Sequence, residues 1–171
     1  MPGRASRILL WLFVINLGIA VGAGLYEGRV VVPHWLSAGP GGELHWNAEA
    51  ARQDDTGLRF WVFTTTVPLT LLTLANLVAA ARAAPPAREW WLAAGVAASL
   101  DRLFTFSYFI PTMVRLVVAP DAPEFAAAAT RWASLNYVRH ALVLAALLAA
   151  LKAFALVYED RGAEEEEKPS P

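Results

Sequence analysis

Apolar residues gather in four long runs along the 171 residues of this chain, and short polar or proline-containing segments separate the runs. The runs cover residues 8–26, 60–81, 90–118 and 133–158. A helix that crosses the roughly 30 Å hydrocarbon core of a membrane needs about 20 mostly apolar residues, at a rise of about 1.5 Å per residue. Each run reaches this length. The pattern therefore predicts an all-α fold, an integral membrane four-helix bundle formed by residues 1–160 as a single domain.

The segments between and after the runs complete the predicted layout. The third run is too long for an untilted helix, so we expect tilt or a break near Pro111. The link "RAAPPAR" is short, and Pro-Pro cannot continue a helix, which predicts antiparallel second and third helices. Residues 28–58 form a long outer loop whose Trp35 and Trp46 favour an interfacial lid. Residues 161–171, rich in glutamate, are expected to be a disordered acidic tail.

Lys and Arg near the ends of the runs set the expected orientation. Arg4 and Arg7 precede the first run, and Arg82 and Arg88 lie in the short link between the second and third. This distribution predicts a multi-pass protein of the bacterial inner membrane with both termini in the cytoplasm. The first run also has the shape of a secretory signal. Because the run is long for a signal and Asn16 interrupts it, we expect the helix to be retained.

Composition narrows the partners and the chemistry. The chain is 57% hydrophobic with a mean hydropathy of +0.42, and its net charge is −1. The lack of cysteine excludes disulfides, thiolate catalysis, iron–sulfur clusters and cysteine zinc sites. No basic patch interleaved with aromatic residues indicates nucleic acid. The expected partners are membrane lipids and a small hydrophobic ligand, and a homo-oligomer or a partner membrane subunit stays open.

Polar side chains inside the third run fall on one face of its helix. Asp101, Thr105, Tyr108, Thr112 and Arg115 are spaced by 4, 3, 4 and 3 residues, which is the spacing of a single helical face. Because unpaired polar groups are costly in hydrocarbon, this face should point into the bundle. The spacing leaves open whether it lines a pocket or only a seam between helices.

The other runs carry polar or small residues that can meet this face. They are Trp132, Asn136, Arg139 and His140 in the fourth run, Asn16, Ala20, Ala23 and Glu27 in the first, and Thr66, Thr70, Thr73 and Asn76 in the second. In the first run, Gly18 and Gly22 would let another helix approach closely. The threonines could serve helix packing alone.

The depth of each residue in its run suggests which side chains meet. Asp101 and Arg139 reach a similar depth near the middle of the membrane, so we expect them to form a structural ion pair. A second group should gather in the outer half of the bundle: Glu27, Trp61, Tyr108, Arg115 and Asn136. Near helix ends, Glu27 and Arg115 could instead only extend to the interface. His140 could carry protons or be a hydrogen-bonded core residue.

The sequence pattern gives little support for a metal or cofactor site. The three histidines, His34, His45 and His140, match no metal-ligand or paired-haem spacing. The sequence also contains neither a glycine-rich phosphate loop nor a Ser-His-Asp pattern. We therefore expect no metal site and no cofactor.

Three segments resemble a known family. "GLYEGRVVVPHW", "FTFSYFIPTMVRL" and "RWASLNYVRHAL" are similar to the small four-helix membrane proteins grouped with fungal anthrone oxygenases, a grouping long called a domain of unknown function. The resemblance implies oxidation of anthrones to anthraquinones by molecular oxygen without an evident cofactor. The matching positions are Tyr26, Glu27, Pro111, Trp132, Asn136 and Arg139. The outer loop has no counterpart in this resemblance.

Two functions follow as alternatives. The first is a cofactor-independent, oxygenase-like enzyme with a polar pocket in the outer half of the bundle, acting on a small hydrophobic or aromatic molecule. Such a reaction needs a general base and groups that stabilise an anion. Glu27 or His140 would be the base, Arg139, Asn136 and Tyr108 would stabilise the anion, and Tyr26, Trp61, Arg115 and Trp132 would contact the substrate. The second is a non-catalytic membrane protein: a ligand binder, a transporter or a subunit of a larger assembly.

Overall fold

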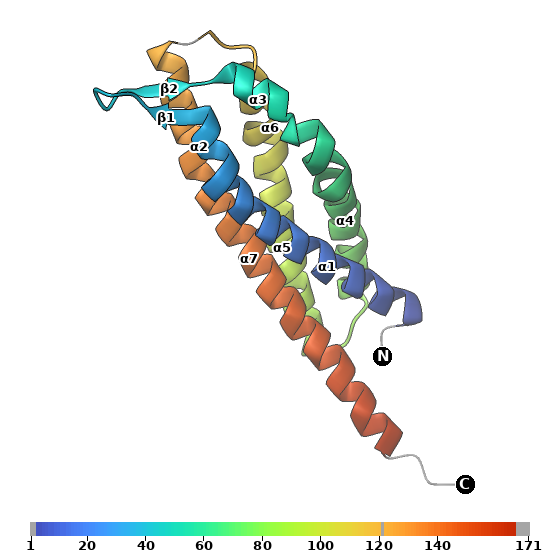
Figure 1. Ribbon diagram of the computed structural model, residues 1–171. Coiled ribbons are helices and arrows are strands. Elements are labelled where there is room, and N and C mark those ends of the chain that lie inside the picture. Colours follow the sequence, from blue (N-terminus) through green and yellow to red (C-terminus); the bar gives the residue numbers. More distant parts are fainter. Residues whose placement is uncertain (1–2, 121, 167–171) are drawn as a thin grey trace.

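The computed structural model of this chain describes residues 3–120 and 122–166, with side chains as far as Glu159. The described chain is predominantly helical, and four long helical segments lie side by side (Figure 1). They are α1 (Arg4–Tyr26), η1 (Glu27–Val31) and α2 (Val32–Trp35); η2 (Gly57–Thr66) and α4 (Val67–Ala81); α5 (Ala87–Phe104), η3 (Thr105–Phe109) and α6 (Ile110–Leu116); and α7 (Pro123–Glu166). The start of α1 and the end of α7 lie at the end opposite the strands (Figure 1).

Three of the helical stretches are long and apolar enough to cross a membrane: Arg4–Trp35, Gly57–Ala81 and Pro123–Glu159. This property indicates an integral membrane protein. The third predicted run does not reach the same mean hydropathy, because Asp101 and Arg102 stand side by side at its centre.

The helices pack through two hydrophobic clusters. One joins α1, α4, α5 and α7 around Leu17, Leu69 and Trp91, and the other lies nearer the strands around Trp35 and Trp132. Large apolar side chains also cover the outer surface of every long helix, as expected where lipid is the solvent.

Asn76 ties three helices together inside the first cluster. Its Nδ2 donates to the carbonyl of Leu9 (3.2 Å), and its Oδ1 accepts from Trp91 Nε1 (2.9 Å). Thr73, by contrast, donates to the Leu69 carbonyl of its own helix (2.6 Å). Asn76 thus serves packing between helices, whereas Thr73 bonds only within its own helix.

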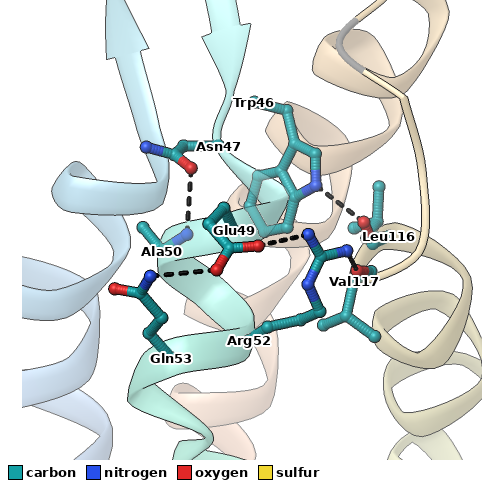
Figure 2. Close-up of polar contacts among 8 residues, drawn as sticks. All are labelled: Trp46, Asn47, Glu49, Ala50, Arg52, Gln53, Leu116 and Val117. Carbon is teal, nitrogen blue, oxygen red and sulfur yellow. Dashed lines mark hydrogen bonds and ion pairs between the residues drawn. The ribbon is translucent and has the colours of Figure 1, made fainter.

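Residues 28–34 of the predicted outer loop continue the first helix through η1 and α2. Residues 35–56 form an ordered segment, called the lid below. It contains β1 (Leu36–Ala38) and β2 (Leu44–Trp46), which pair antiparallel, and α3 (Ala48–Asp54). Figure 2 shows how the lid covers the C-terminal end of α6, whose last carbonyls have no partner within the helix. Trp46 Nε1 donates to the Leu116 carbonyl (2.8 Å), and Arg52 Nη1 donates to the Val117 carbonyl (2.7 Å).

Each of the three π-helical segments ends two residues before a proline: Pro33, Pro68 and Pro111. Proline has no N–H, and its ring clashes with the carbonyl four residues earlier in a regular α-helix. The residue before each proline instead donates five residues back: Val32 to Glu27, Val67 to Val62 and Ile110 to Thr105. The wider turn accommodates the proline, so the third run continues through Pro111 without a break.

Two sequence expectations differ from the structure. Gly18 and Gly22 do not receive a neighbouring helix, since a Cβ at either would meet nothing within 4 Å. The close approaches are at Gly24 and Gly95, which touch His140 and Leu77. α7 continues to Glu166, past the predicted start of the disordered tail at residue 161, because Ala and Glu favour helix. Residues 167–171 of that tail lie outside the described residues.

Candidate functional site

The three π-helical segments converge on one cavity of about 90 Å³. Its walls come from η1, η2, η3 and α7, together with residues of the lid and α6: Glu27, Trp35, Thr56, Gly57, Trp61, Thr66, Thr105, Phe109, Ile110, Met113, Trp132 and Arg139. Single π-helical turns inside α-helices occur frequently at functional sites. Four of the wall residues are aromatic, so much of the wall is apolar.

Glu27 is the acidic group of this cavity. Its side chain is only 7% exposed, although it belongs to a helix that is long and apolar enough to span a membrane. Oε1 accepts hydrogen bonds from Trp61 Nε1 (2.7 Å) and Thr56 Oγ1 (3.0 Å). None of the residues that the structure describes donates to Oε2. One carboxylate oxygen is thus held in place while the other can accept a proton.

Arg139 supplies the positive charge of the site. Its guanidinium carbon lies 5.5 Å from the ring centroid of Trp61 and 4.9 Å from that of Phe109, in cation–π contact with both. Arg139 is attracted electrostatically to Glu27 and Asp101, yet among the described residues no carboxylate oxygen lies within 4 Å of it. Its charge therefore remains available to an anion in the cavity.

A second, smaller cavity of about 50 Å³ is also lined by Glu27. Asn136 and His140 of α7 line it, with Gly28, Val32, Ala133 and Tyr137. Asn136 Nδ2 donates to the Trp132 carbonyl (3.2 Å), whereas Asn136 Oδ1 and His140 Nε2 are buried with no partner among the described residues. Glu27 is thus flanked by two polar residues that could bind a ligand in this cavity.

The predicted Asp101–Arg139 ion pair is not formed. Asp101, fully buried, pairs instead with the neighbouring Arg102 through Nε (2.9 Å) and Nη2. The long Arg102 side chain folds back onto the carboxylate beside it, while the Arg139 side chain is held between the two rings. Similar depth in the membrane did not bring the two side chains into contact.

Tyr108 and Arg115 were expected beside Glu27, and the structure places them elsewhere. The wider π-helical turn shifts the register of the third run, so that the buried positions are Asp101, Thr105 and Phe109. Tyr108 and Arg115 line a separate groove between α6 and α7. Phe109, which the sequence reading did not select, takes the place predicted for Tyr108.

The other residues predicted to contact a substrate also separate into those that line a cavity and those that do not. Trp61 and Trp132 line the larger cavity, and Trp132 Nε1 donates to the Phe109 carbonyl (3.3 Å). Tyr26 is 62% exposed and lines neither cavity. Thr56, which holds Glu27, was missed because it lies in the loop, where no helical spacing marks it. The prolines that follow the π-helical segments were the available signal for Phe109.

The part of the chain that the structure describes contains no group of three or more His, Asp or Glu side chains placed to hold a metal ion. The groups that converge are a carboxylate, a guanidinium, an imidazole, an amide and aromatic rings. Such a set can accept a proton and stabilise the resulting anion.

Comparison with known proteins gives no relative: no protein-family model, no curated protein and no solved structure matches this chain.

Proposed function

We propose that this chain is a four-helix integral membrane protein of the bacterial inner membrane, and that it removes a proton from a small hydrophobic or aromatic molecule. Glu27 is the general base and Arg139 stabilises the anion. One observation carries the proposal: Trp61 and Thr56 hold Oε1 of Glu27, Oε2 has no donor among the described residues, and an unpaired guanidinium lies in the same cavity.

The cavity walls define the substrate class. Trp35, Trp61, Phe109 and Trp132 favour a planar apolar molecule over a charged or sugar-like one. An apolar cavity of about 150 Å³ holds benzene. Each of the two cavities beside Glu27, about 90 and 50 Å³, is smaller than this, so even a single aromatic ring requires some movement of the walls. A fused three-ring substrate requires the walls to part.

The resemblance to anthrone oxygenases supports an oxidative continuation. After Glu27 takes a proton from a CH2 group, the carbanion reduces molecular oxygen. One oxygen atom forms a new C=O bond, and the other leaves as water with the two hydrogens of the CH2 group. This continuation needs O2 as the oxidant and no further electron donor.

Proton removal and oxidation are tested separately. The purified protein in lipid nanodiscs is mixed, without oxygen, with small aromatic molecules that have an acidic C–H, and solvent deuterium entering that position is followed by NMR. Oxygen uptake is then measured in air. Glu27→Gln keeps an acceptor for Trp61 and Thr56, so it should still fold and bind but exchange at least about 100-fold more slowly. Glu49→Gln, a surface carboxylate of the lid, is the matched control.

The outcomes separate the two candidate functions. If Glu27→Gln and the unaltered protein exchange deuterium at the same rate, Glu27 is not the general base. Ligand binding without exchange in either would favour a non-catalytic binder or assembly subunit. The helix-to-helix contacts of Asn76 favour this second candidate, since they show polar groups of the bundle used for packing alone.

A further inference from the structure

A groove of about 500 Å³ runs between α6 and the first turns of α7, close to the lid. Tyr108, Thr112 and Arg115 line it from one side, and Glu124 and Arg131 from the other. The groove is larger than either cavity beside Glu27 and shares no residue with them.

The two arginines of the groove have no anionic partner in the described part of the chain. Among the described residues, neither Arg115 nor Arg131 makes an ion pair or a side-chain hydrogen bond, and the hydroxyls of Tyr108 and Thr112 have no partner either. Glu124 is the one carboxylate among the described residues that line the groove. The lining therefore carries one excess positive charge, with two hydroxyl donors beside it.

The apolar part of the lining indicates what kind of anion fits. Leu116, Phe125 and two alanines form the rest of the wall. Arg115 and Arg131 stand near the ends of helices placed in the membrane above, at the level of the lid, where phospholipid headgroups lie. A phosphate with acyl chains attached matches cations at this level and apolar walls beside them. A free inorganic anion would not use the apolar walls.

We infer that this groove binds the headgroup of an anionic phospholipid from the outer leaflet, with Arg115 and Arg131 contacting its phosphate. The forked guanidinium suits a phosphate oxygen pair. The excess positive charge favours an anionic lipid over a zwitterionic one. The inference rests on the proposed membrane placement and is independent of the role of Glu27.

Native mass spectrometry of the full chain measures the retained lipid. The protein is placed in nanodiscs of phosphatidylglycerol and phosphatidylcholine in equal amounts, released, and scored for bound lipid. The unaltered protein should retain phosphatidylglycerol preferentially. Arg115→Gln/Arg131→Gln should lower this retention about tenfold or more, since two charge-assisted hydrogen bonds are lost. Ala127→Trp, which fills the groove without altering charge, should lower it as well.

Arg82→Gln/Arg88→Gln is the matched control, because it removes the same charge at the opposite end of the bundle. Equal retention of the two lipids by the unaltered protein would overturn the inference, as would an equal loss in the control. Binding of inorganic phosphate that displaces no lipid would also overturn it, since the groove would then be an anion site and not a lipid site.

Discussion

His140 packs against α1 only because residue 24 has no side chain. A Cβ at Gly24 would lie 2.5 Å from His140 Nε2 and 2.8 Å from Cδ2, well inside van der Waals contact. Gly22, two residues earlier in the same helix, has nothing within 4 Å of its Cβ position. The two glycines look alike in the sequence, and only one is required by its surroundings.

We expect Gly24→Ala to destabilise the protein by about 1–3 kcal/mol, because the added methyl group must displace the imidazole. Gly22→Ala should be neutral or stabilise by up to about 1 kcal/mol, since alanine is the better helix former. Thermal unfolding in detergent compares the two. Adding His140→Ala to Gly24→Ala should restore most of the loss. If the two alanine variants unfold at the same temperature, the close contact is absent.

At the scale of the element, a proline that follows a π-helical segment leaves a backbone carbonyl of the preceding turn without its usual N–H donor. Pro68 cannot donate to the Thr64 carbonyl four residues earlier, and Asn16 Nδ2 of α1 donates to that carbonyl instead (2.8 Å). A polar residue in the first run thus compensates for a proline in the second. This explains why Asn16 is buried without lining either cavity beside Glu27.

Asn16→Leu should therefore cost about 1–3 kcal/mol, because it leaves the Thr64 carbonyl unpaired. In the Pro68→Ala background the cost should fall by about 1 kcal/mol or more, since an alanine in place of the proline can supply the missing N–H. A double-mutant cycle on unfolding free energies measures this coupling. Strictly additive effects would contradict the proposed compensation.

The lid has a pH-dependent contact on α3. Glu49 accepts hydrogen bonds from Arg52 (2.5 Å) and Gln53 (2.9 Å), which lower its pKa from the ordinary value of a glutamate, with Arg52 contributing most. A carboxyl whose pKa is lower in the folded state stabilises that state above its unfolded pKa. The stabilisation is lost as the pH falls through the lowered value.

NMR titration of Glu49 should give a midpoint below the ordinary value of a glutamate, and Arg52→Met should raise that midpoint. Arg59→Met, which removes an arginine outside α3, is the control and should leave it unchanged. If the titration midpoint of Glu49 does not change in Arg52→Met, the carboxylate does not make this contact in solution.

For the whole molecule, the number of membrane crossings decides where the chain ends lie. Three described helices satisfy the length and apolarity expected of a span, whereas four long helical segments pack against one another (Figure 1). With four crossings the two termini face the same side. With three crossings they face opposite sides.

We expect four crossings, because the Asp101–Arg102 pair faces protein and its charges neutralise each other. A reporter that fluoresces only in the cytoplasm should be active when fused to either terminus and inactive when inserted at the Gly39–Gly42 turn of the lid. Activity at one terminus alone would indicate three crossings.

The sequence by itself determined the helical class, the central part of each long helix and the identity of the charged residues inside them, whereas the first helical stretch runs on to Trp35 and α7 begins earlier, at Pro123. The features it determined follow from hydrophobic run lengths, which are a property of the chain. It also selected Glu27, Asn136, Arg139, Trp61 and Trp132, all of which line the two cavities. Their helical spacing and their depth along the apolar runs were the signals for them.

Only the tertiary structure decided which side chains meet. Face assignment at 3.6 residues per turn failed after Thr105, because the π-helical turn before Pro111 moved Phe109 into the site and Tyr108 out of it. Depth alone paired Asp101 with Arg139, while packing against Trp61 and Phe109 held Arg139 away. Register and rotamer depend on contacts between segments distant in the chain, and a single helix does not contain that information.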